Sequence, residues 1–145
     1  NKVVRRAMIL ARKSGIPMVA AVGNWGGADK PAFPAAYPDV VAVTAVGPYR
    51  SIYKKVNTGN YVDFAAPGVK LWTAVPGGGG KYQSGTSFSA PFLTTIVGLE
   101  AAAGRKTDAH GLRSMLARGS KDLSKKGKDN TFGFGFIERK PNCRA

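Results

Sequence analysis

The feature that most constrains this chain is a glycine-bearing turn that leads into an apolar helix and displays one serine. Residues 85–91 read GTSFSAP, and residues 91–103 are apolar on nearly every face, which is typical of a helix in the middle of a domain. Pro91 is expected in the first turn of this helix, where a missing N–H costs little. The positive end of the helix dipole would then lie beside the Ser87 hydroxyl and favour negative charge there. An acyl-transfer enzyme needs such an environment around its nucleophile.

The same residues, taken alone, also fit a helix cap. In that interpretation Thr86 or Ser87 accepts hydrogen bonds from the unpaired N–H groups of the first turn. The motif is not the nucleophile elbow of the α/β-hydrolases, because Ser89 stands where that elbow has its second glycine. The choice between a cap and a nucleophile therefore depends on the rest of the chain.

Residues 85–91 resemble the serine motif of the subtilisin-like serine proteases (subtilases), and further segments match that family in the same order. Residues 19–24 (VAAVGN) are similar to the end of the strand that carries the family's oxyanion asparagine. Residues 37–43 (YPDVVAV) resemble the strand that follows, and 63–69 (DFAAPGV) resemble the element that precedes the serine. Residues 132–137 (FGFGFI) are similar to the closing strand of the domain.

This resemblance implies an α/β fold with a partial doubly wound, mainly parallel sheet, in which residues 1–145 form the C-terminal part of one peptidase domain. The hydrophobic pattern independently alternates strands with helices, which indicates an α/β layer. Strands are expected near residues 17–22, 40–46, 62–65, 69–74 and 132–137, and helices near 1–14, 91–103 and 107–117. The glycines at 77–80 are expected to form a flexible turn that leads to the serine loop.

By the same resemblance, Ser87 is the nucleophile that forms an acyl-enzyme, and Asn24 points its side-chain amide at the developing oxyanion. The alternative for Asn24 is a simple turn residue, since Gly-Asn after a strand is ordinary turn chemistry. The segment that contains Ala21, Val22 and Gly23 would form one wall of the substrate pocket. Ala32 and Phe33 would form its base, with a cis bond between Phe33 and Pro34.

The resemblance also touches on a metal. The backbone carbonyls of Ala35, Tyr37 and Val40 match a weak cation site of some family members. Carbonyl ligands leave no side-chain signature, so a structural calcium is not assigned here and no cofactor is expected.

The chain lacks the family's aspartate and histidine motifs, which lie in the N-terminal half of a subtilase domain. Its one histidine is His110, which the resemblance places on a peripheral helix after the serine helix. A catalytic base must lie within about 3 Å of the serine oxygen, directly or through one water. We therefore expect His110 to be a solvated residue at a helix start, and this chain alone to be inactive.

The leading interpretation is a serine endopeptidase, acting on protein or peptide substrates once an N-terminal half supplies the histidine and aspartate. The family resemblance implies a secreted or periplasmic location. The alternative is a non-catalytic remnant that binds a partner through its exposed strand edge or its basic surface.

A formal net charge of +14 raises nucleic acid or an anionic membrane as partners. The basic residues lie on a helix face near the N-terminus and in the loop at 121–128, without the interleaved aromatic side chains of a stacking platform. No specific nucleic-acid site is therefore expected. No apolar run approaches the ~20 residues that span a bilayer. The single cysteine, Cys143, has no partner in the chain for a disulfide or a metal site.

Overall fold

A computed structural model describes residues 1–27, 31–105 and 107–138. Its centre is a five-stranded sheet with the strand order β1-β2-β3-β7-β6. The strands β1, β2, β3 and β7 run parallel, and only the short β6 is antiparallel to its neighbour. Their bounds are Val19–Ala21 for β1, Val41–Val46 for β2, Phe64–Pro67 for β3, Ser120–Lys121 for β6 and Phe136–Ile137 for β7. The predicted mainly parallel α/β fold is confirmed.

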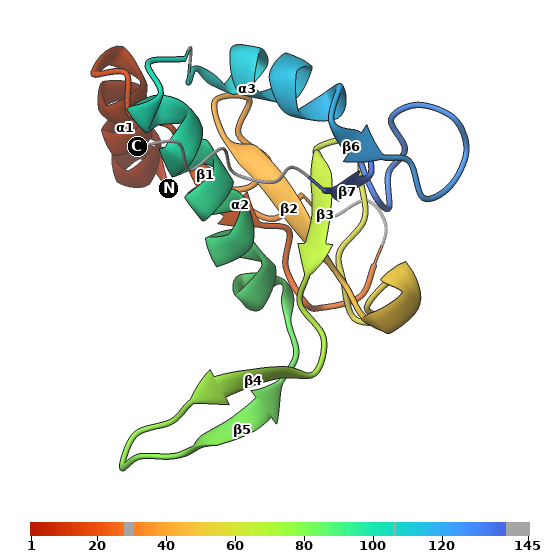
Figure 1. Cartoon of the computed structure of the whole chain (residues 1–145). Helices are drawn as coiled ribbons and strands as arrows, with labels where there is room; N and C mark the ends of the chain where they lie inside the picture. Colours follow the sequence, from red (N-terminus) through yellow and green to blue (C-terminus); the bar gives the residue numbers. More distant parts are fainter. Residues whose placement is uncertain (28–30, 106, 139–145) are drawn as a thin grey trace.

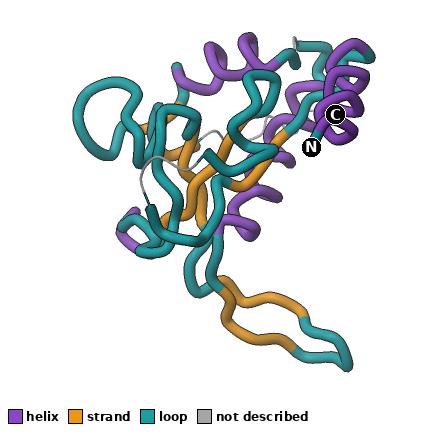
Figure 2. The backbone as a smooth tube through the Cα atoms, turned by 180° about the vertical axis from the view of Figure 1, so that it is seen from behind, coloured by secondary structure: helices purple, strands orange, loops and turns teal. Residues whose placement is uncertain are grey.

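The strand β2 is buried along its whole length because both faces of the sheet are covered. Val41 and Val43 contribute to a core on one face, together with Leu93 of α2 (Thr86–Ala102) and Leu112 of α3 (Ala109–Ala117). Ala42 belongs to a smaller core on the other face. Figure 1 shows α2 lying along the sheet, and Figure 2 shows that loops rather than helices cover much of the opposite side.

The N-terminal helix α1 (Lys2–Lys13) begins where the sequence places it. The Asn1 side chain accepts hydrogen bonds from the backbone N–H groups of Val3 and Val4, and Gly15 follows the helix with a φ of 71°. None of the residues of α1 is buried, and Leu10 is 58% exposed. The helix therefore stands beside the core and leaves part of its apolar surface uncovered.

A hairpin of β4 (Leu71–Ala74) and β5 (Gly80–Gln83) projects from the body of the molecule between β3 and α2 (Figure 1). Trp72 packs edge-on against Tyr82 across the two strands, with ring centroids 5.2 Å apart. A short 3-10 helix covers Pro48–Arg50.

The structure differs from the sequence prediction most clearly at the serine helix. Helix α2 begins at Thr86 rather than at Pro91, so Pro91 lies inside the helix and the expectation that it occupies the first turn is wrong. Because Pro91 has no N–H, the carbonyl of Ser87 lacks its usual donor four residues later. Ser87 itself is therefore part of the first helical turn.

Candidate active site

Ser87 lies at the start of α2, directly after the strand β5 and the turn at Ser84 and Gly85. Its side chain is on an exposed residue, in contrast to the buried Thr86 before it. As a first-turn residue, Ser87 has a backbone N–H without an acceptor inside the helix. The serine hydroxyl, a free N–H and the positive end of the helix dipole thus occur at one place.

The structure brings Asn24 to this helix start from a distant part of the chain. The Oδ1 atom of Asn24 accepts hydrogen bonds from the backbone N–H of Thr86 at 2.9 Å and from its hydroxyl at 3.1 Å. These bonds fix the carbonyl end of the amide on Thr86, so its Nδ2 group remains as the donor end. This arrangement can present two N–H donors, from Asn24 and Ser87, to one developing negative charge.

A second asparagine holds the loop that carries Asn24. Asn57, which is buried, accepts a hydrogen bond from the N–H of Trp25 at 2.9 Å on its Oδ1, and its backbone N–H donates to the carbonyl of Gly23. The residues on both sides of Asn24 are therefore tied to Asn57. Neither Asn57 nor the bond from Thr86 to Asn24 is predictable from the sequence, because nothing in the local pattern marks an asparagine or threonine whose partner lies far along the chain.

The floor below Ser87 is closely packed. The buried hydroxyl of Ser89 donates to the carbonyls of Ala66 and Pro67, and the N–H of Gly85 donates to the carbonyl of Gly68 at 2.8 Å. A Cβ on Gly68 would lie 2.3 Å from the Ser89 Oγ atom, so only glycine permits this approach. The segment at 66–68 therefore anchors the helix start to the sheet through Ser89, which leaves Ser87 as the serine that faces outward.

His110 lies in the first turn of α3 and is exposed. Figure 1 shows α3 across the end of the molecule away from the hairpin and the start of α2. Its neighbour Asp108 caps the helix by accepting a hydrogen bond from the N–H of Gly111 at 2.9 Å, and this bond lowers the pKa of the Asp108 carboxyl. The predicted solvated histidine at a helix start agrees with this position.

The residues predicted for a substrate pocket lie at the end of β1 and in the loop after it. Val22 is buried, and its carbonyl accepts a hydrogen bond from the Tyr61 hydroxyl. Gly23 has a φ of 103°, and a Cβ there would lie 2.7 Å from the Trp25 ring. Ala21 closes β1 and is half-buried. This end of β1 leads directly to Asn24.

Ala32 and Phe33 belong to the loop between β1 and β2. Ala32 is 9% exposed, whereas Phe33 is 60% exposed and packs on Tyr37 with ring centroids 4.6 Å apart. The bond between Phe33 and Pro34 is cis, as expected from the resemblance. The role of these residues in binding stays a prediction.

Neither a metal-binding cluster of side chains nor a membrane-spanning helix occurs in the described residues. Among them, no group of three or more histidine, cysteine, aspartate and glutamate side chains is placed to hold a metal ion. Within the same ranges, every helix is too short or too polar to cross a membrane. Cys143 lies outside the described residues.

The family model described as "Subtilase family" matches residues 2–135 of the chain. The chain is similar to the minor extracellular protease Epr of Bacillus subtilis, with 31% identity over 140 residues that cover 97% of this chain and 22% of that protein. It is 30% identical to thermitase of Thermoactinomyces vulgaris over 86% of this chain and 43% of that protein. It is also 31% identical to the major intracellular serine protease of Bacillus subtilis over 66% of this chain and 31% of that protein.

Solved structures of proteases also resemble this chain over most of its length. The prenylagaramide maturation protease PagA superposes with a TM-score of 0.78 at 25% identity, over 95% of this chain and 53% of that chain. The patellamide maturation protease PatA superposes with a TM-score of 0.75 at 29% identity, over 92% of this chain and 52% of that chain. The 145 residues thus span less than half of the length of these curated relatives and about half of the solved chains. The match over nearly the whole chain shows that it belongs to the subtilase family of serine peptidases.

Proposed function

We propose that these residues form the nucleophile and oxyanion half of a serine endopeptidase that cleaves peptide bonds in proteins or peptides. The observation that carries this proposal is the pair of hydrogen bonds from Thr86 to Asn24. They hold an amide donor beside the helix start that displays Ser87. Helix capping alone would not require an exposed serine together with an oriented amide from a separate loop.

In the proposed reaction, the Oγ atom of Ser87 attacks the carbonyl carbon of the scissile bond while a base removes its proton. The resulting oxyanion accepts hydrogen bonds from the Ser87 N–H and the Asn24 Nδ2 group. The same base then protonates the leaving amine, and water hydrolyses the acyl-enzyme on Ser87. The segment that contains Ala21 and Gly23 would form one wall of the pocket for the substrate side chain.

In this proposal the base and the aspartate that orients it come from residues outside this sequence, because His110 lies on α3, at the end of the molecule away from the start of α2. The outer edge of β1 is suited to receive that part of a domain, because β1 ends the strand order. An unpaired strand edge offers N–H and C=O groups for another strand. The uncovered apolar residues of α1 would extend the same contact.

Secretion, or export to the periplasm, is the location that we propose for the complete enzyme. The similar protein Epr is named as extracellular, whereas another similar relative is named as intracellular. The family match alone is therefore compatible with both locations.

The proposal is tested by labelling with a fluorophosphonate after the chain has been joined to the N-terminal half of a subtilase domain. We expect covalent label on Ser87, because the probe reacts with an activated serine hydroxyl. Ser87→Ala should abolish labelling. Ser114→Ala, a change of another exposed serine on α3, is the matched control and should label like the parent.

Labelling that survives Ser87→Ala would contradict the assignment of the nucleophile. A correctly folded, joined protein that takes no label at all would favour the alternative of a partner-binding remnant.

A further inference from the structure

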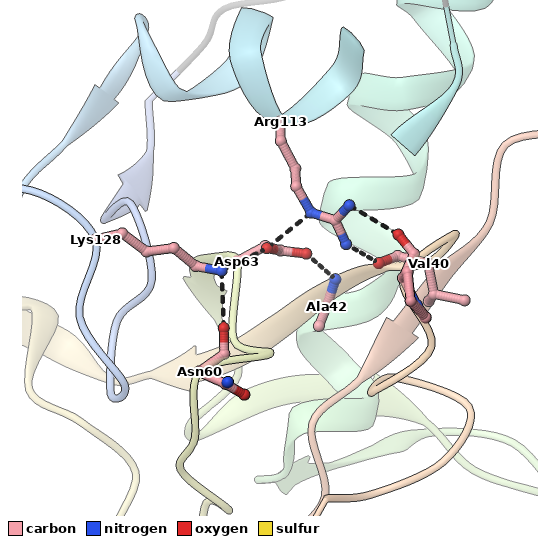
Figure 3. A network of polar contacts seen from close by, with 7 residues as sticks. Val40, Ala42, Asn60, Asp63, Arg113 and Lys128 are labelled. Atoms are coloured by element: carbon pink, nitrogen blue, oxygen red, sulfur yellow. Dashed lines mark hydrogen bonds and ion pairs between the residues drawn. The ribbon is translucent and has the colours of Figure 1, made fainter. Parts of the chain in front are cut away.

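A charged network lies at the side of the sheet, away from the proposed nucleophile. Its centre is Asp63, which is 1% exposed and immediately precedes β3. The Oδ1 atom of Asp63 lies 2.9 Å from Nε of Arg113 and 3.2 Å from Nζ of Lys128, and Oδ2 accepts the N–H of Ala42 at 3.0 Å. Figure 3 shows the two cationic side chains converging on the carboxylate from α3 and from the loop after β6.

Arg113 does more than neutralise Asp63. Its guanidinium also donates to the carbonyl of Pro38 at 2.9 Å and to the carbonyl of Val40 at 2.5 Å. One planar cation is therefore ion-paired with a carboxylate oxygen, without a well-directed hydrogen bond to it, and donates hydrogen bonds to two backbone oxygens of the segment that leads into β2 (Figure 3). A set of carboxylate and carbonyl oxygens is also the set that a hard metal cation such as Ca²⁺ binds.

This network bears on the weak cation site that the family resemblance suggests at the carbonyls of Ala35, Tyr37 and Val40. The Val40 carbonyl is taken by the guanidinium of Arg113, and the Tyr37 carbonyl accepts the N–H of Val40 at 3.0 Å. The carboxylate that could compensate a metal charge, Asp63, already faces two cationic side chains. The residues present therefore do not fit a bound metal ion at this corner of the molecule, which is the region between Asp63 and the carbonyls of Pro38 and Val40.

We propose that Arg113 is a built-in structural cation that takes the place of a metal ion between Asp63 and the carbonyls of Pro38 and Val40. Arg113 belongs to α3, so folding itself brings its positive charge to this position, and no ion from the solvent has to supply it. Its planar fork of donors matches several oxygens at once, which a lysine cannot do. The corner thus needs no added cation, and removal of the guanidinium exposes an oxygen-lined site for a small cation.

Lys128 supports the same arrangement from the other side of the carboxylate. Its Nζ atom donates to the carbonyl of Asn60 at 2.8 Å and lies 5.5 Å from the centre of the Phe134 ring. These contacts hold Lys128 in place without Arg113. The two interpretations of Arg113, as an ion-pair partner only or as a built-in cation, differ in what they predict for a variant without the guanidinium. Only a built-in cation can be replaced there by a small cation from the solvent.

The experiment measures the melting temperature of the chain in EDTA and in millimolar CaCl₂, with NaCl and KCl series at matched ionic strength. The parent chain should have the same melting temperature in all of these solutions. Arg113→Met should lower the Tm by roughly 6 °C or more in EDTA, because it leaves a buried carboxylate short of a partner. At least one of the three cations should restore half of that loss or more.

The matched control is Arg12→Met. Arg12 lies 3.4 Å from Asp39 in a surface pair in which both side chains are well exposed, so its removal should not create a cation response. Calorimetric titration with Ca²⁺, Na⁺ and K⁺ gives a second readout. We expect no binding heat above that of the Arg12→Met variant for the parent, and a saturable heat for Arg113→Met.

Two results would overturn the proposal. The first is a parent whose Tm rises with a cation beyond the change seen for Arg12→Met, since a separate metal would then share the corner. The second is an Arg113→Met chain that none of the three cations restores, since Arg113 would then be an ion-pair partner only. If Arg113→Met is unfolded in EDTA, refolding in each cation replaces the melting curve, and a chain that stays unfolded in all of them counts as the second result.

Discussion

Asn24 and Thr86 are 62 residues apart in the chain, yet they form the contact on which the candidate oxyanion site depends. Asn24→Ala in the joined enzyme removes the amide donor, and because Asn24 itself is exposed, water can reach the two Thr86 donors that lose their acceptor, so folding should be retained. Turnover should fall by about 10²–10³-fold, the loss that removal of an oxyanion donor causes in a subtilisin. Steady-state kinetics should show the loss in kcat with little change in KM. An unchanged kcat would remove Asn24 from the reaction.

Thr86 permits a sharper test of how Asn24 is held. Thr86→Val keeps the backbone donor and the side-chain shape but removes the hydroxyl that donates to Asn24 at 3.1 Å. We expect kcat to fall by about 5–10-fold, since one neutral hydrogen bond contributes about 1 kcal/mol. Combined with Asn24→Ala, the same change should have no further effect on kcat. Additive losses in the double variant would mean that Thr86 acts independently of Asn24.

The site residues divide into those that the sequence could predict and those that it could not. Ser87 and Asn24 stand in short motifs whose local context, a turn before a helix and a strand end, is visible in the sequence. Thr86 and Asn57 act through contacts between segments far apart in the chain, and a buried amide or hydroxyl has no periodic pattern. The same holds for Arg113, whose three oxygen partners come from the residue before β3 and from the loop before β2.

At the scale of single elements, α3 offers a test of the fold that does not involve the site. Asp108 caps this helix, and the N–H of Gly111 is the main cause of its lowered pKa, below the ordinary value of 3.8. A lowered folded-state pKa gives stability that is present above pH 3.8 and is lost as the pH falls through the folded-state value.

Asp108→Ala should therefore lower the free energy of unfolding near pH 7 by about 0.5–1 kcal/mol, at the low end for caps because Asp108 is exposed to solvent. Urea unfolding at pH 7 and at pH 3 measures the difference from the parent. The difference should shrink at the lower pH. A difference of the same size at both pH values would show that the charge of Asp108 contributes nothing.

The elements themselves were predicted with uneven success, for identifiable reasons. The strand β2 is an apolar run interrupted only by Thr44, and it begins and ends within one residue of its predicted bounds. The strands β5 and β6 cannot be recognised from the sequence, because β5 (GKYQ) is mostly polar and follows a run of glycines, and β6 has only two residues, so neither has a hydrophobic period. The start of α2 was placed too late because proline usually marks a first turn, whereas here the helix extends through it.

At the scale of the whole molecule, the alternation of strands and helices predicted a mainly parallel sheet. The strand order β1-β2-β3-β7-β6 could not be read from the sequence, because it depends on where each connection between successive strands places the next strand in the sheet. The order leaves β1 at one edge and the short β6 at the other. Only the edge at β1 lies next to the strand end that leads to Asn24.

The 145-residue chain by itself should not hydrolyse peptides, because its one histidine, His110, lies on α3, away from the start of α2 that carries Ser87. In a subtilisin, removal of the histidine alone lowers turnover by about 10⁶-fold. A peptidase assay of the purified chain, with Ser87→Ala as the control, should give equal background rates. Activity that depends on Ser87 would point to an unrecognised base, and His110→Ala would then be the next variant to measure.

The β4–β5 hairpin makes the molecule suitable for carrying foreign peptides. Its tip contains Gly77, Gly78 and Gly79, and a Cβ at any of these positions would meet no atom within 4 Å. Its base is fastened by the bond from the Gly85 N–H to the Gly68 carbonyl and by the bond from the Lys70 N–H to the Ser84 hydroxyl. A recognition tag or a reporter loop inserted at Gly78 would therefore extend into solvent, while this base keeps the helix start beneath Ser87 in place.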